Sequence, residues 1–157
     1  SSFSKNLSFY GERLGALSVV SPNAEEKKLV LSQLKYIVRR LYSNPPCHPA
    51  IIAADVLNDE VLFKEWTDEV AEMHVRIKAM RQRLFDVLSA KVPGRDFSYI
   101  TKQRGMFSFS GLSPAQVERL IQDYGIYLVK NGRMCVAGLN TKNIEYVANA
   151  FADVLKD

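Results

Sequence analysis

The chain has 157 residues, of which 47% are hydrophobic and 24% are charged, and its formal net charge is +4. This composition is that of a globular protein, and no run of about 18 uncharged apolar residues predicts a membrane helix. Basic residues are interleaved with acidic ones, as in Glu25-Glu26-Lys27-Lys28, and are not gathered in one stripe, so the charge does not indicate nucleic-acid binding. Cys47 and Cys135 lack metal-ligand spacing, so we expect buried or half-buried free thiols and no metal site.

The first sixty residues predict one strand and two helices. Residues 14–20, Leu-Gly-Ala-Leu-Ser-Val-Val, are typical of a buried strand. Ser21-Pro22-Asn23 and the acidic residues after it indicate a helix start, and this helix should run to about Arg40. Pro45-Pro46 cannot continue a helix, and a second, short helix is expected over 49–57.

One long helix is predicted over residues 60–91. Apolar side chains recur there at intervals of three and four residues and should form a buried stripe: Trp66, Val70, Met73, Ile77, Met80, Leu84 and Val87. At ~1.5 Å per residue the helix would span roughly 48 Å. A globule of this length is only about 40 Å across. The helix should therefore bridge two domains or pack on a partner, and part of the molecule should lie outside this chain.

After Pro93 the pattern changes to short elements of a small α+β unit. Ser113 should cap a helix that has Pro114 at its first position, and Asn131-Gly132 is a strong hairpin signal. The expected elements are strands at 97–100, 106–110, 126–129 and 133–137, and helices at 113–124 and 141–155.

The stretch that could carry chemistry lies at the start of the chain. Lys5 follows the hydroxyl residues Ser2 and Ser4, and Arg13 comes eight residues later. A lysine amine can form a Schiff base with an aldehyde, while arginine and serine side chains can bind phosphate. The pattern fits a cofactor that carries both groups. By spacing alone, it fits a surface lysine near a surface arginine as well.

Two segments near Lys5, 2–6 and 10–15, closely resemble the cofactor-attachment signature of class I aminotransferases, and of aspartate aminotransferases in particular. Later segments are similar to the interface loop and the small domain of the same family: 42–46, 104–109, 124–127 and 131–139. The resemblance covers essentially all of the chain, in one order and spacing. It corresponds to the last two fifths of a full-length enzyme.

The resemblance implies the α+β C-terminal portion of a fold-type-I enzyme dependent on pyridoxal 5'-phosphate. Residues 1–58 would end its large α/β domain, residues 59–92 would form the bridging helix, and residues 93–157 would form the small α+β domain. The enzyme would be a homodimer with shared active sites. The chain starts at Ser1 without an initiator Met and is expected to be a processed, cloned or cleaved piece.

The family's cofactor and substrate roles carry over to individual residues. Lys5 would bind the cofactor covalently and move a proton between the substrate and the cofactor. Arg13 and Ser2 would bind the cofactor phosphate, with Ser4 adjacent to them. Arg133 would bind the substrate α-carboxylate, although its position after a tight turn by itself fits a solvent-facing arginine.

Specificity would depend on the end of the first helix. In the family, an arginine four positions before the serine of the interface loop binds the distal carboxylate of the substrate in the neighbouring subunit. The serine here is Ser43, so the arginine is Arg39. Arg40 is adjacent but points about 100° away, so only one of the two can serve. Tyr42 and Ser43 would approach the other subunit's cofactor, and Phe107 would line the substrate pocket, unless it is a core residue.

The implied activity of the parent enzyme is amino transfer between aspartate and 2-oxoglutarate. A related enzyme that also accepts aromatic amino acids is an alternative, and so is a non-catalytic interaction module. The chain alone should be inactive, because the family's contacts to the pyridine ring lie upstream. We expect a cytoplasmic protein that binds no nucleic acid or membrane, with a mitochondrial form left open.

Overall fold

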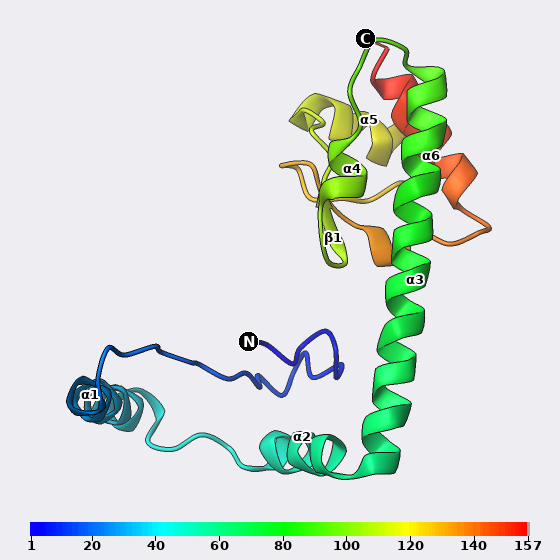
Figure 1. Cartoon of the computed structure of the whole chain (residues 1–157). Coiled ribbons are helices and arrows are strands. Elements are labelled where there is room, and N and C mark those ends of the chain that lie inside the picture. Colours follow the sequence, from blue (N-terminus) through cyan, green and yellow to red (C-terminus); the bar gives the residue numbers. More distant parts are fainter. Residues whose placement is uncertain (157) are drawn as a thin grey trace. The chain divides into compact units, whose positions relative to one another are not determined.

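The computed structural model describes residues 1–156 and divides the chain into two compact units, which meet in the sequence between Val70 and Ala71 (Figure 1). The helices of the first unit are α1 (Ala24–Tyr42), α2 (His48–Asn58) and the first part of α3 (Glu60–Lys91). The second unit contains the rest of α3, α4 (Tyr99–Lys102), β1 (Phe107–Phe109), α5 (Pro114–Tyr124), β2 (Arg133–Cys135), the 3-10 helix η1 (Val136–Gly138) and α6 (Ile144–Val154). No helix in the described residues is long and apolar enough to cross a membrane.

In the first unit, the two predicted helices are confirmed as α1 and α2. The Asn23 side chain caps α1 by accepting a hydrogen bond from the Glu26 main-chain N–H at 2.8 Å. Acidic residues occupy its first turn, and Arg39 and Arg40 occupy its last, which suits the helix dipole. None of the α1 residues, all of which are described, is buried within this chain.

The strand predicted at 14–20 is wrong. Only an isolated bridge between Ser2 and Gly15 forms there among the described residues, and Leu17 and Val20 are 77% and 98% exposed. Apolar, β-branched residues favour a strand only where a neighbouring strand can pair with them. No described strand of this chain lies beside this segment to do so.

The long helix is confirmed as α3, with the predicted bounds. Its apolar stripe is buried only toward the C-terminal end, where Met80, Leu84 and Val87 join the core of the second unit. Trp66 is half-buried, and Met73 is 41% exposed. The regular spacing therefore predicts the helix correctly. It predicts burial correctly only for the C-terminal half of the apolar stripe.

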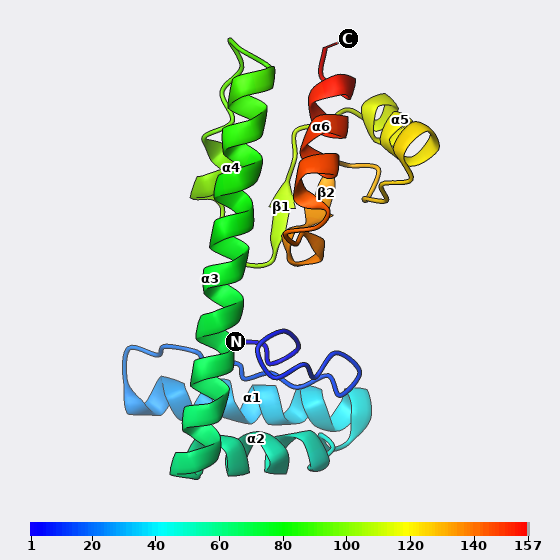
Figure 2. The ribbon, with the colours of Figure 1, turned by 90° about the vertical axis from the view of Figure 1, so that its right-hand side faces the viewer.

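In the second unit, the predicted strand at 106–110 and the helices at 113–124 and 141–155 are confirmed as β1, α5 and α6. β1 and β2 form an antiparallel pair, which Figure 2 shows; the register pairs Phe107 with Cys135 and Phe109 with Arg133. Ser113 and Gln116 form a reciprocal capping box at the start of α5. The core of this unit lies between α3, α5 and α6, and its most buried side chains are Leu84, Leu88, Phe97, Ile100, Val117, Leu120, Val136, Ala148 and Val154.

Two predicted strands are absent from the described structure. At 97–100, the Asp96 carboxylate accepts a hydrogen bond from the Ser98 N–H at 2.7 Å and turns the chain into α4. After residues 126–129 the chain does reverse direction, at a turn in which the Gly132 N–H donates to the Val129 carbonyl at 2.8 Å. The Val129 N–H also donates to the Arg133 carbonyl at 3.1 Å, but the strand partner of β2 is β1 and not this segment, because strand pairing depends on elements that are distant in the sequence.

The two cysteines are free thiols, as predicted, but both are exposed and not buried. Cys47 lies directly before α2, and Cys135 lies on β2. Neither position faces the core of its unit. Within the described residues, no three His, Cys, Asp or Glu side chains are grouped so that they could hold a metal ion.

Candidate active site

Residues 1–16 form a closed segment that we call the Lys5 loop. Its two ends are joined by main-chain hydrogen bonds, from Phe3 N–H to the Leu14 carbonyl at 3.1 Å and from Ala16 N–H to the Ser1 carbonyl at 3.0 Å. Gly15 lies at this junction, where a Cβ would come within 2.7 Å of the Ser1 carbonyl oxygen. A glycine is therefore needed for the two ends to approach each other.

The loop holds all four residues predicted to bind the cofactor. The Ser2 hydroxyl donates to Ser4 Oγ at 3.2 Å and accepts from the Ser4 N–H at 3.3 Å. Lys5 Nζ lies 4.1 Å from the centre of the Tyr10 ring, and Arg13 Nη1 donates to the Tyr10 carbonyl at 2.9 Å. Tyr10, to which the sequence analysis assigned no role, therefore contacts both the lysine and the arginine.

The backbone of this region is strained at three non-glycine residues. Ser8 and Arg13 in the Lys5 loop have φ angles of 56° and 55°, and Ser43 after α1 has φ 68°. This conformation costs an L-residue about 1–2 kcal/mol and is enriched at functional sites. Two of the three residues, Arg13 and Ser43, are ones that the sequence analysis placed at or near the active site.

The first turns of α3 support the Lys5 loop from inside the same unit. The Trp66 indole N–H donates to the main-chain carbonyl of Asn6 at 2.7 Å. The side-chain oxygen of Asn6 is buried and has no hydrogen-bond partner within residues 1–156. A buried acceptor without a donor is costly. Its position directly after Lys5 indicates a site that is completed by a further group, and the loop's amine, hydroxyls and guanidinium fit an aldehyde that carries a phosphate.

At the end of α1 the structure separates the two adjacent arginines. Arg39 Nη1 donates to Ser43 Oγ at 2.6 Å, whereas Arg40 lies against Tyr36, with Nη1 3.3 Å from its hydroxyl. Ser43 forms the centre of a γ-turn that the Asn44 N–H closes onto the Tyr42 carbonyl at 2.8 Å. The side chain of Arg39 and the strained Ser43 thus lie together, and Arg40 is turned elsewhere.

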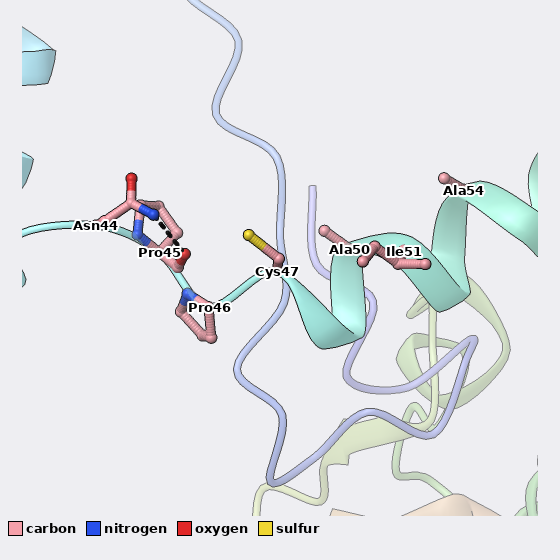
Figure 3. A pocket seen from close by; sticks show the side chains of 7 residues that line it. All are labelled: Asn44, Pro45, Pro46, Cys47, Ala50, Ile51 and Ala54. Atoms are coloured by element: carbon pink, nitrogen blue, oxygen red, sulfur yellow. Dashed lines mark hydrogen bonds between the residues drawn. The ribbon is translucent and has the colours of Figure 1, made fainter.

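An apolar hollow follows this turn in the chain. Figure 3 shows its lining residues, with the Asn44 amide donating to the Pro45 carbonyl at 3.2 Å. The hollow lies over the start of α2 and is lined by Asn44, Pro45, Pro46, Cys47, Ala50, Ile51 and Ala54. Three of its lining residues, Asn44, Pro45 and Pro46, belong to the segment 42–46 that resembles the family's interface loop.

In the second unit, Arg133 and Phe107 lie together on neighbouring strands. The guanidinium carbon of Arg133 is 4.1 Å from the centre of the Phe107 ring. Arg133 is exposed and Phe107 is half-buried, and both line a shallow hollow with Tyr127 and Val129. The exposed guanidinium, with its face on the ring, can donate hydrogen bonds from its edge to a planar anion. Phe107 is therefore not a purely internal core residue.

The predicted site residues fall into three groups. The Lys5 loop contains Ser2, Ser4, Lys5 and Arg13; the end of α1 contains Arg39, Tyr42 and Ser43; and the sheet of the second unit contains Phe107 and Arg133. Sequence reasoning missed Tyr10, Asn6 and the buried Arg81. Tyr10 and Asn6 lie inside the recognised motif, but nothing in the sequence marks Arg81.

Comparison with known proteins gives one family for the whole chain. The model for "Aminotransferase class I and II" matches residues 1–151. An aromatic-amino-acid aminotransferase from Escherichia coli K12 is 57% identical over 154 residues, and an aspartate aminotransferase from Pseudomonas aeruginosa is 50% identical over 155. These matches cover 98% and 99% of this chain, but the chain spans only 39% of the length of either relative.

Solved structures agree with this result. An aromatic-amino-acid aminotransferase from Psychrobacter sp. B6, cocrystallised with aspartic acid, is 57% identical with a TM-score of 0.90, over 99% of this chain and 39% of that one. An aromatic-amino-acid aminotransferase from Burkholderia pseudomallei, covalently bound to pyridoxal phosphate, is 54% identical with a TM-score of 0.87, over 98% and 38%. The fold is that of the matching part of fold-type-I aminotransferases, and the chain belongs to the class I and II aminotransferase family.

Proposed function

We propose that the full-length protein containing this chain transfers an amino group between L-aspartate and 2-oxoglutarate, giving oxaloacetate and L-glutamate. The observation that carries this proposal is the Lys5 loop. It brings one amine, two hydroxyls and one guanidinium into a single closed segment that is supported by Trp66. Family membership supports the reaction class, and the pair of substrates rests on Arg39 and Arg133.

The cofactor of this enzyme is pyridoxal phosphate, as the family and the Burkholderia structure support. When bound, it supplies the electron sink that makes the substrate α-carbon acidic. Lys5 would attach the cofactor covalently, and Arg13 would present its fork to the phosphate beside the hydroxyls of Ser2 and Ser4. The left-handed backbone at Arg13 aims this side chain, which also keeps its bond to the Tyr10 carbonyl.

Lys5 would also carry the proton of the reaction. Its amine would take the proton from the substrate α-carbon and return it elsewhere on the reacting system. The Tyr10 ring, 4.1 Å from Nζ, would keep the amine close to its working position during this exchange. Proton transfer by a positioned side chain typically contributes about 10²–10⁴ in rate.

Selection of a dicarboxylate substrate would need two guanidinium groups. Arg133, stacked on Phe107, would bind the α-carboxylate through its free edge. Arg39 would bind the distal carboxylate of a substrate in the partner subunit of a homodimer. Its partner in this chain is the neutral hydroxyl of Ser43, and a carboxylate accepts about twice as strong a hydrogen bond, so substrate can compete for the guanidinium.

A broader enzyme that accepts both aspartate and aromatic amino acids is a second candidate. Two relatives with 57% identity are named for aromatic amino acids, and one of them was crystallised with aspartic acid. Turnover of L-aspartate and L-tyrosine by the full-length protein separates the two candidates. A kcat/KM for tyrosine within about 10² of that for aspartate favours the broad enzyme, since a site built only for a second carboxylate would reject a substrate without it by about 10⁴ or more.

The reaction class is tested by adding pyridoxal phosphate, reducing with borohydride and mapping the labelled peptides. Labelling of Lys5 alone, together with loss of amino transfer in Lys5→Ala, supports the proposal. Label spread over many surface lysines, in a full-length protein that transfers no amino group, would leave a non-catalytic interaction module instead. Lys64 serves as the internal control, because it is an exposed lysine that pairs with Asp68 on the surface of α3.

A further inference from the structure

The second unit contains a buried arginine that the proposed function does not use. Arg81 lies on α3 with 4% of its surface exposed, beside the core residues Met80 and Leu84. Within the described residues, no carboxylate lies in ion-pair range of it. Burial lowers the pKa of its guanidinium, yet an arginine keeps its charge in a protein. Such a group is stable inside a core only when its donors are satisfied.

The donors of Arg81 converge on the segment that leads into β1. Nη1 donates to the Ile100 carbonyl at 2.8 Å and to Ser108 Oγ at 3.1 Å. Nη2 donates to the carbonyls of Gly105 and Phe107 at 2.9 and 2.8 Å. A planar guanidinium can reach acceptors on several sides at once because its donors are fixed in a fork. Arg81 therefore ties α3 to both sides of the turn before Phe107.

Gln103 continues this connection along the edge of β1 that does not pair with β2. Its side-chain oxygen accepts from the Phe109 N–H at 2.8 Å, and its amide nitrogen donates to the Phe109 carbonyl at 3.1 Å. The Ser108 hydroxyl donates to the same oxygen of Gln103. Arg81 and Gln103 thus supply the hydrogen-bond partners that a third strand would otherwise give to this edge of β1, and they hold the strand in place.

The position of β1 decides the position of the substrate-binding arginine. Phe107 and Arg133 are diagonal neighbours across the β1–β2 pair, and their ring and guanidinium stack at 4.1 Å. We propose that Arg81 is a positioning residue for Arg133, which it holds in place through the main chain and the ring of Phe107. This inference rests on the proposed function, because it assumes that Arg133 binds the substrate α-carboxylate.

The test uses the full-length enzyme loaded with pyridoxal phosphate, with L-aspartate and L-alanine as substrates. L-Alanine has an α-carboxylate but no distal carboxylate, so its KM depends on Arg133 and not on Arg39. We expect Arg81→Met to raise KM for both substrates by the same factor, roughly tenfold or more, because a displaced Arg133 loses part of its charge-assisted hydrogen bonds to the α-carboxylate. The value of kcat and the absorbance of the bound cofactor should change much less. Arg81→Lys should recover only part of the loss, because a lysine cannot span these acceptors.

Arg83→Met is the matched control. Arg83 lies on the same helix, but its side chain is exposed and pairs with Glu145 on α6. It should leave both KM values unchanged. A fall in melting temperature for Arg81→Met with unchanged KM values would overturn the inference and leave Arg81 as a support of the core alone.

Ser108→Ala is the deciding variant if Arg81→Met does not fold. It removes one acceptor of Arg81, together with the hydrogen bond from Ser108 to Gln103, and leaves the three carbonyls in place. A smaller, equal rise in KM for both substrates supports the inference, and unchanged values refute it. Arg133→Leu separates this result from the proposed function. If Arg133→Leu leaves KM unchanged, the assignment of the α-carboxylate site itself is wrong, whereas a raised KM there with normal Arg81 variants contradicts only the role of Arg81.

Discussion

The closed Lys5 loop makes a direct prediction about Gly15. In Gly15→Ala, the new Cβ would lie 2.7 Å from the Ser1 carbonyl oxygen, whereas ordinary contact begins at 3.4 Å. The two ends of the loop must therefore separate by at least about 0.7 Å to remove the clash. Because the obstacle is a main-chain oxygen, no side-chain rotation can relieve it.

This separation acts on the residues that hold the cofactor. The Ala16 to Ser1 hydrogen bond lies at the point of the clash, and Ser2 is the next residue. Loss of one such bond costs about 0.5–1.5 kcal/mol. A shift approaching 1 Å at a catalytic group costs up to about 10² in rate. We expect kcat/KM for L-aspartate in the full-length enzyme to fall roughly ten- to a hundredfold, together with weaker binding of pyridoxal phosphate in a spectroscopic titration.

Gly11→Ala is the control, because Gly11 lies in the same loop and a Cβ there meets nothing within 4 Å. It should change the free energy of unfolding by less than about 0.5 kcal/mol and leave kcat/KM intact. If both variants lose activity equally, or if Gly15→Ala keeps full activity and cofactor affinity, the argument from the loop junction is refuted.

Three further predictions concern the second unit. Phe107→Leu should raise KM for L-aspartate about two- to fivefold, since a cation–π contact at an exposed site is worth about 0.5–1 kcal/mol. Steady-state kinetics of the full-length enzyme checks this, and an unchanged KM would contradict the role of the Phe107 ring. Leu84→Ala should destabilise the protein by about 2–5 kcal/mol in denaturant unfolding, because Leu84 is fully buried. Asp96→Asn should lower the melting temperature at pH values above about 4, and progressively less below that.

Two hydrogen bonds from Ser98 determine how the stabilising effect of Asp96 changes with pH. The Ser98 N–H and then the Ser98 hydroxyl lower the pKa of the Asp96 carboxyl below its usual 3.8. A lowered pKa in the folded state adds stability above the unfolded-state value and loses it as the pH falls through the folded-state value. The difference in melting temperature between the wild type and Asp96→Asn should therefore shrink as the pH falls below about 4. A difference that stays constant down to pH ~2 would contradict this role.

Local patterns were sufficient to predict the helices. The bounds of α3 follow from apolar spacing over many turns, and α1 and α5 follow from caps at Asn23 and Ser113, whose interactions lie within one turn. The predicted strands fared less well: 106–110 and 133–137 each contain a short strand, while 14–20, 97–100 and 126–129 do not. A helix satisfies its own hydrogen bonds, whereas a strand depends on a partner elsewhere in the sequence.

The candidate site shows the same division. The resemblance of the opening motif identifies Lys5, Ser2, Ser4 and Arg13 as candidates, and the structure adds that they share one loop closed at Gly15. The count of four residues from Ser43 selects Arg39, and the structure adds that Arg39 contacts Ser43 while Arg40 turns to Tyr36. The roles of these residues stay predictions.

The sequence by itself determined the family, the order of the helices and the residues expected to meet cofactor and substrate, because these are carried by linked motifs and by local periodicity. Only the tertiary structure decided which half of the long helix is buried and which strand pairs with β2. It alone revealed Arg81, since an arginine on a helix normally points to solvent. Four acceptors from distant positions must converge before its burial becomes favourable, and that convergence exists only in the folded chain.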